Sequence, residues 1–119
     1  MTMLSKEAIL KSDDLPRQKV SVPQWGGDVF VRTLTGTERD AFEQSCINAK
    51  GKNQEMNLAN IRARLCVLTI CTEEGTRLFT AGDVDKLGKK SSAALDLIFS
   101  VAQSLNGLGS KDIEDLSGN

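Results

Sequence analysis

The chain contains the segment Val22-Pro23-Gln24-Trp25-Gly26-Gly27-Asp28-Val29-Phe30-Val31-Arg32-Thr33-Leu34-Thr35-Gly36-Thr37-Glu38-Arg39-Asp40. Apolar and polar residues alternate over 18–23 and 28–34, and the turn between them holds Gly26-Gly27, which predicts a β-hairpin. Thr35 precedes Glu38 by the spacing of a helix-capping box. The segment therefore predicts two strands followed by a helix that begins near residue 35.

Capping residues and helical periodicity predict further helices on both sides of this segment. The predicted helices are 5–12 capped by Ser5, 35 to about 49, one capped by Asn57 that carries Leu58, Ile61, Leu65, Leu68 and Ile70, a short one over 81–87, and one from Ser91 or Ser92 to Asn106. Residues 50–55 read as a loop, and Arg77-Leu78-Phe79 reads as a brief extended segment. The fold class is therefore α+β and mainly α-helical, with four to five helices and one small N-terminal β-hairpin.

The length of 119 residues suits one domain with its own core. We expect that domain to cover 1–119 and to contain an N-terminal helix or arm over 1–17, the β-hairpin over 18–34, a helical core over 35–108 and a C-terminal tail over 109–119. The two longest predicted helices are more apolar than a small helical domain requires. We interpret this excess as a surface for self-association or a groove for partner helices.

The charge pattern argues against nucleic-acid and membrane partners. Fifteen Lys and Arg residues are interspersed with sixteen Asp and Glu residues, and the pI is near 5.4. A protein of this kind lacks the basic face that neutralises phosphate backbones. The chain also has no apolar run of ~20 residues that could span a bilayer, and its first residues lack the apolar centre of a secretory signal.

The residues needed for most enzyme mechanisms are missing. The chain has no histidine and no tyrosine, which excludes Ser-His-Asp and Cys-His arrangements. Cys46, Cys66 and Cys71 do not have zinc-ligand spacing, and we interpret them as buried free thiols. The acidic pairs Asp13-Asp14 and Glu73-Glu74 lie in predicted turns. We therefore expect no catalytic residue, no bound metal and no cofactor.

Four apolar side chains are candidates for contact with a partner: Trp25, Phe30, Leu78 and Phe79. Trp25 lies in the predicted hairpin turn, where it either covers the core or serves as an exposed anchor, since tryptophan is enriched at binding hot spots. The pair Leu78-Phe79 presents the same two alternatives. The sequence pattern leaves both alternatives open.

From residue 3 to about 108 the chain resembles the tail assembly chaperones of long-tailed phages and prophages. The specific part of the resemblance is a Pro-x-Trp-Gly-Gly turn followed by a Leu-Thr-Gly-x-Glu-Arg helix start. The matching segments are Leu4-Ser5-Lys6-Glu7-Ala8-Ile9-Leu10, Val22-Pro23-Gln24-Trp25-Gly26-Gly27, Val31 to Glu43, Ile61-Arg62-Ala63-Arg64-Leu65 and Gly75-Thr76-Arg77-Leu78-Phe79-Thr80. None of these segments is a catalytic motif, so the resemblance implies a binding role.

The resemblance implies that the protein coats the tape measure protein and keeps it soluble until tail tube subunits polymerise around it. It also implies a place in the bacterial host cytoplasm and absence from the mature virion. In lambda-like systems a ribosomal frameshift yields a longer form whose extra domain recruits the tail tube protein. Two alternatives stay open: a small structural tail-completion or neck component of the virion, and a small regulatory or nucleic-acid-binding protein.

Overall fold

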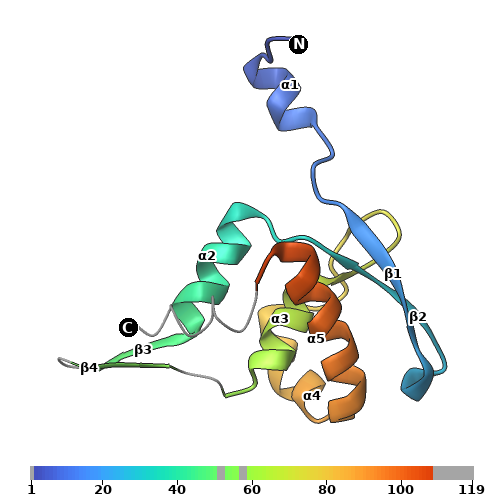
Figure 1. Ribbon diagram of the computed structural model, residues 1–119, viewed down its shortest axis with the longest axis vertical. Coiled ribbons are helices and arrows are strands. Elements are labelled where there is room, and N and C mark those ends of the chain that lie inside the picture. Colours follow the sequence, from blue (N-terminus) through green and yellow to red (C-terminus); the bar gives the residue numbers. More distant parts are fainter. Residues whose placement is uncertain (1, 51–52, 57–58, 109–119) are drawn as a thin grey trace.

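The computed structural model describes residues 2–50, 53–56 and 59–108, and the described part measures 47 × 41 × 25 Å. Within those ranges the fold is α+β and mainly helical, with a three-stranded sheet and a separate two-stranded sheet (Figure 1). The elements in chain order are α1 (Lys6–Lys11), β1 (Arg17–Val22), the 3-10 turn η1 (Pro23–Trp25), β2 (Gly27–Arg32), α2 (Gly36–Ser45), β3 (Ile47–Lys50), β4 (Asn53–Met56), α3 (Ile61–Thr69), β5 (Ile70–Cys71), the 3-10 turn η2 (Ala81–Asp83), α4 (Val84–Gly88) and α5 (Ser92–Asn106).

The predicted hairpin is confirmed, and it belongs to an antiparallel sheet with the strand order β1-β2-β5. Val20 pairs with Val29, and Val31 pairs with Ile70 on the other side of β2. Strand β1 is therefore an edge strand. The first strand ends at Val22, because Pro23 opens the 3-10 turn and Gly26 takes a left-handed conformation with φ of 71°.

The predicted caps of α1, α2 and α5 are present. In the capping box of α2, the backbone N–H of Glu38 donates to Thr35 Oγ1 at 3.1 Å, and the backbone N–H of Thr35 donates to Glu38 Oε1 at 2.9 Å. The side chains of Ser5 and Ser91 accept from the first turns of α1 and α5. Gly107 ends α5 with φ of 68°, which is a common glycine conformation after a helix.

Two predictions for the middle of the chain are wrong. Helix α2 ends at Ser45 rather than near Ala49. Of the residues predicted as a loop over 50–55, Lys50 lies in β3 and residues 53–55 lie in β4, and these two strands form a hairpin. The β-branched Ile47 and the following Asn48 are poor helix formers, so they favour the end of α2. The two residues that join β3 to β4 lie outside the described residues.

Helix α3 begins at Ile61, after Asn60, and the predicted cap Asn57 and the predicted stripe residue Leu58 lie outside the described residues. Ile70, which was assigned to this helix, instead forms β5 with Cys71. Their pairing with Val31 and Phe30 of β2 satisfies backbone groups that a continued helix would have bonded internally.

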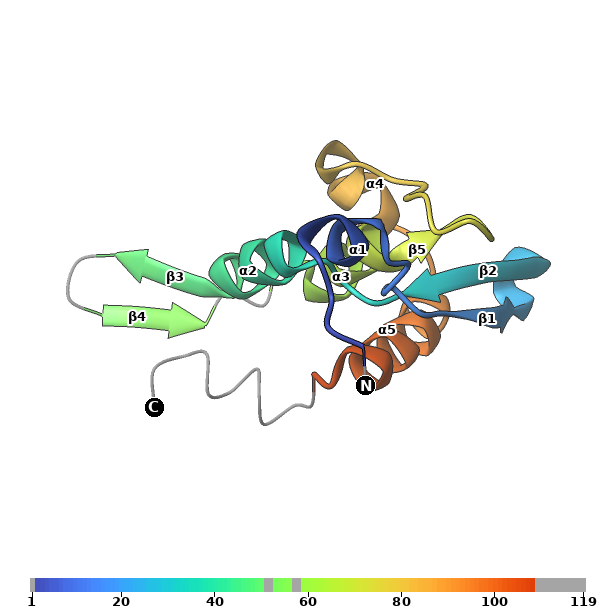
Figure 2. The same cartoon turned by 90° about the horizontal axis from the view of Figure 1, so that it is seen from above.

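The core lies around α3, which is surrounded by α2, α4, α5 and the sheet (Figures 1 and 2). Most of the broad apolar surface of α3 is therefore used inside the domain. The buried residues of the cluster are Val20, Val22, Val31, Phe42, Cys46, Ala63, Leu65, Cys66, Val67, Ile70, Leu87, Ala94, Leu95, Ile98, Ala102 and Leu108. No helix among the described residues is both long enough and apolar enough to cross a bilayer.

Helix α1 stands apart from this core, at the end of an extended segment that leads into β1 (Figure 1). It buries none of its residues. Its apolar side chains are open to solvent, with exposures of 54% for Ile9 and 73% for Leu10, and the preceding Leu4 is 66% exposed. The N-terminal arm, defined here as residues 4–15, therefore receives little support from its own domain.

Candidate functional site

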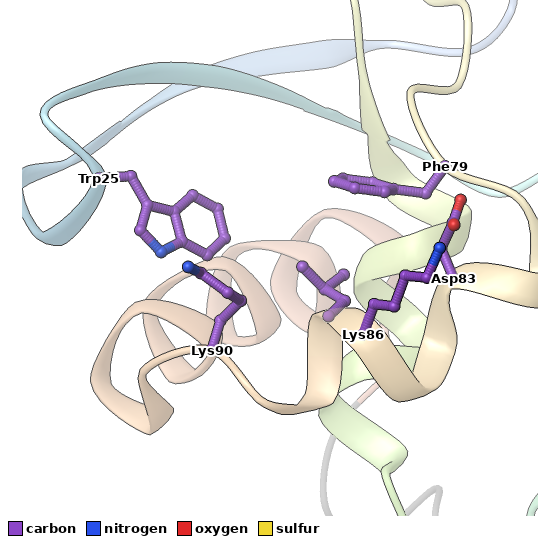
Figure 3. A pocket seen from close by; sticks show the side chains of 6 residues that line it. Trp25, Phe79, Asp83, Lys86 and Lys90 are labelled. Carbon is purple, nitrogen blue, oxygen red and sulfur yellow. The ribbon is translucent and has the colours of Figure 1, made fainter.

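An apolar surface pocket of about 300 Å³ lies between the tip of the β1–β2 hairpin and α4 (Figure 3). In Figure 3 the rings of Trp25 and Phe79 stand at opposite ends of this space, with Lys90 near the indole and Asp83 near the phenyl ring. This Trp25–Phe79 pocket is lined by Trp25, Phe79, Asp83, Lys86, Leu87 and Lys90. Its volume is at the lower end for ligand pockets, which suits a few apolar side chains.

Local sequence rules position both aromatic walls. Trp25 is the last residue of the turn that Pro23 begins, and the left-handed Gly26 then turns the chain into β2. Hydrogen bonds made by the residues on either side of Phe79 hold its backbone in place. The backbone N–H of Leu78 donates to the carbonyl of Ile70 at 3.2 Å, and the following Thr80 forms a capping box with Asp83. Both rings are half-buried and pack against the core.

The rim of the pocket is charged while its lining is apolar. Lys86 and Lys90 are exposed, and in the part of the chain that the structure describes no carboxylate lies within ion-pair distance of either ammonium group. A hydrogen bond from the backbone N–H of Thr80 lowers the pKa of Asp83, so this carboxylate is ionised at neutral pH. The rim therefore offers two cations and one anion to an incoming segment.

One polar atom of the pocket residues is unused. Trp25 Nε1 is buried, and it has no hydrogen-bond acceptor among the described residues. A buried N–H group without a partner is costly, so this turn carries an energetic cost within the domain itself. The apolar lining and the rim lysines of the pocket suit an apolar side chain that is accompanied by an acidic group.

The structure brings together two of the four predicted contact residues. Trp25 and Phe79 face the same pocket, and Trp25 is half-buried and packs against the core. Phe30 pairs with Lys19 and Cys71, which puts it on the opposite face of the sheet from Val20 and Val31.

Leu78 is 53% exposed but does not line the pocket. Sequence reasoning missed Leu87, which is buried under the pocket, and the two rim lysines. The sequence carried no signal for these residues as a set, because Leu87 and Lys86 are ordinary members of the predicted short helix over 81–87 and Lys90 lies beyond it.

A buried ion cluster supports the segment that carries Phe79. Arg32 at the end of β2 donates to Glu38 Oε2 at 2.8 Å, and Arg77 Nη1 approaches the same oxygen at 3.4 Å. Arg77 Nε also donates to the carbonyl of Val67 at 3.3 Å. Burial acts to raise the pKa of Glu38, but hydrogen bonds from Arg32 and Thr35 and the charges of Arg32 and Arg77 outweigh it and lower that pKa.

A second apolar pocket, of about 190 Å³, lies between α2, α3 and the start of α4. Its lining includes Phe42, Val67 and Val84. We favour the Trp25–Phe79 pocket as the binding site because it combines two aromatic walls with lysines that have no ion-pair partner in the described ranges.

The three cysteines have the properties of core residues. All of them are buried and free. Burial, with a smaller effect of the Asp96 charge, raises the pKa of Cys66 to about 12, and burial also raises the pKa of Cys46 and of Cys71. A thiol is nucleophilic only as a thiolate, so these groups are unsuited to catalysis at neutral pH.

Comparison with known proteins gives a family and a related fold. A family model described as phage tail assembly chaperone matches residues 5–118. A solved structure of the tail assembly chaperone of bacteriophage HK97 is similar in fold, with a TM-score of 0.58 and 16% sequence identity, over 76% of this chain and 85% of that chain. Among curated proteins, none matches the sequence.

Proposed function

We propose that this chain, which belongs to the phage tail assembly chaperone family, binds apolar helical segments of the tape measure protein and prevents their aggregation during tail assembly. The family is non-catalytic, and membership in it implies partners among the tail proteins. A chaperone of this kind works by covering apolar surface, so the relevant feature of the molecule is a surface pocket rather than a reactive group.

The observation that carries this proposal is the combination of apolar walls and a charged rim in the Trp25–Phe79 pocket. An amphipathic helix inserts one or two apolar side chains into such a pocket and keeps its polar face in water. Lys86 and Lys90 would pair with acidic residues that flank the inserted side chain.

The remaining partners follow from the same family role. We expect the tail tube protein to be recruited by a longer, frameshifted form of the chain, and we expect the chaperone to self-associate. We place its action in the cytoplasm of the bacterial host. The finished virion would lack it, and mass spectrometry of purified particles and of infected cells tests that point.

The direct test is co-expression with the tape measure protein, scored by the fraction of tape measure protein that stays soluble. The wild-type chain should raise that fraction strongly. The double variant Lys86→Glu/Lys90→Glu should lose most of the effect, because both substitutions lie on the exposed rim and leave the core unchanged. Lys89→Glu is the matched control, since Lys89 is exposed on the same turn but does not line the pocket.

Failure of the wild-type chain to keep the tape measure protein soluble would refute the proposed function. If the wild type works and the rim variant works equally well, the function stands but the pocket is not its site. Substitution of Trp25 or Phe79 by alanine should weaken solubilisation further. The same substitution at Phe30 or Leu78 tests whether the contact extends beyond the pocket.

A further inference from the structure

We propose that the N-terminal arm of one copy occupies the Trp25–Phe79 pocket of a second copy, and that a tape measure segment displaces it. The second half of this statement rests on the proposed function, whereas the first half concerns only this chain. Three features of the arm support it: its exposed apolar residues, its fixed direction away from its own pocket and its charge pattern.

The arm has the capping signals of a folded helix but lacks a surface to pack on. Ser5 caps α1 by accepting from the backbone N–H of Ala8 at 3.1 Å, and Ser12 closes its other end by donating to the carbonyl of Ile9. Leu4 and Ile9 stand at the two positions of a hydrophobic staple. Isolated helices below about 12 residues are marginal in water, so α1 needs a partner surface to remain helical.

The pocket of the same chain is badly placed to receive the arm. Arg17 holds the base of the arm, because its guanidinium donates to the carbonyl of Glu73 at 2.8 Å, to the carbonyl of Leu15 at 3.1 Å and to Asp13 at 3.3 Å. Trp25 follows the opposite end of β1, about 17 Å along the strand. From this base α1 points away from the body of the domain (Figure 1).

The charges of the arm complement those of the pocket. In α1, Lys6 lies three and four residues before Ile9 and Leu10, so the three side chains share one side of the helix. Insertion of Ile9 and Leu10 into the pocket of a second copy would bring Lys6 toward its Asp83. Glu7 is next to this face and would meet Lys86 or Lys90.

Such an exchange gives the pocket a cover when no client is present. Exposed apolar patches promote unwanted association, and a chaperone must keep such a patch available. An arm that is short and binds through few residues is easily displaced by a longer client helix with more contacts. The pocket would thus be covered in both states, whereas the arm would be covered only when no client is bound.

Light scattering coupled to size-exclusion chromatography, over a range of protein concentrations and without tape measure protein, tests the arm–pocket contact. The wild type should self-associate. Leu10→Glu in the arm and Lys86→Glu/Lys90→Glu in the pocket should each weaken association at least about tenfold, as expected for loss of an anchor. Ala8→Glu is the matched control, because it adds the same charge two residues away, on the other side of the helix.

Two combinations separate a specific contact from a general loss of stability. Glu7→Lys should restore association when it is added to Lys86→Glu/Lys90→Glu, because the charges are then exchanged. An equimolar mixture of the Leu10→Glu chain and the rim variant should form mixed complexes, because an intact arm and an intact pocket are both present. Circular dichroism checks that every variant is folded.

A strictly monomeric wild type would overturn the proposal. Association of Leu10→Glu at the wild-type level would also overturn it. The same holds if Leu10→Glu fails to associate while Lys86→Glu/Lys90→Glu associates normally. Displacement is tested separately: with a tape measure fragment added, wild-type complexes should dissociate, and Leu10→Glu should bind the fragment more tightly than the wild type. Weaker binding by Leu10→Glu would refute displacement, whereas a fragment that binds no variant would refute the proposed function and leave the self-association result standing.

Discussion

Glu38 is the residue whose substitution gives the sharpest test of the fold. Its carboxylate is shared by Arg32, which is 4% exposed, and by Arg77, while its other oxygen completes the capping box of α2. Glu38→Gln keeps a capping acceptor, because glutamine also serves in capping boxes. The substitution removes the negative charge and turns an amide donor toward the guanidinium of Arg32.

The expected cost follows from the burial of this ion cluster. Removing one partner of a buried ion pair costs about 3–5 kcal/mol, because the other charge stays buried. Arg77 is partly exposed, with 29% of its side chain accessible, so water can solvate that part of the cluster. We therefore expect a loss of about 2–3 kcal/mol in the free energy of unfolding, or about 1–2 M in the urea midpoint.

Urea unfolding at pH 7, followed by the fluorescence of the single tryptophan and by circular dichroism, measures this loss. Glu43→Gln is the matched control on the same helix. Glu43 pairs with Arg39 at 3.0 Å, with 34% and 41% of the two side chains exposed, so its loss should cost less than about 1 kcal/mol.

The pH dependence gives an independent check with a defined sign. The pKa of Glu38 is lower in the folded state than its usual value of 4.5. The stabilisation is therefore complete above pH 4.5 and is lost as the pH falls through the folded value. The difference between the wild type and Glu38→Gln should shrink on acidification. A difference that does not change with pH, or a cost no larger than that of Glu43→Gln, would refute the reasoning.

Three further predictions concern the core and a turn. Ile98→Ala should lower the free energy of unfolding by about 2–5 kcal/mol, because Ile98 is completely buried. Leu97→Ala should lower it far less in the same urea assay, because Leu97 is 38% exposed. Gly75→Ala should lower the free energy of unfolding by about 1–2 kcal/mol, because φ is 93° there and an added Cβ would lie 2.9 Å from Nη1 of Arg17. Gly27→Ala is its control, because no atom lies within 4 Å of a Cβ added at that position. Cys66 should react with a thiol reagent at pH 8 only after unfolding, and rapid labelling of the native protein would contradict its assigned burial.

The elements that could be predicted from the sequence are those set by local rules. The Thr35–Glu38 box starts a helix through bonds between residues three apart, and Gly107 ends one through its own backbone conformation. Strand β5 could not be predicted in this way, because Ile70 and Cys71 continue the apolar run of α3 and only their pairing with the distant β2 makes them a strand.

The pocket was predictable only in part, for a related reason. Trp25 and Phe79 each stood out as large apolar residues beside a turn, yet their meeting depends on how the hairpin packs over α4. The rim lysines carried no signal of their own, since an exposed lysine is ordinary in any sequence. Their significance comes from the aromatic walls next to them and from the absence of an ion-pair partner within the described ranges.

The placement of the prolines also affects how this protein avoids joining other sheets. The sequence contains two prolines, and they bracket the edge strand β1, as Pro16 before it and Pro23 after it. A proline has no N–H to offer, and the charged Lys19 midway along the strand further discourages a neighbour. The exposed edge of β1 is thereby a poor template for a strand of another chain, so contacts with other proteins are made more readily by side chains than by backbone pairing at this edge.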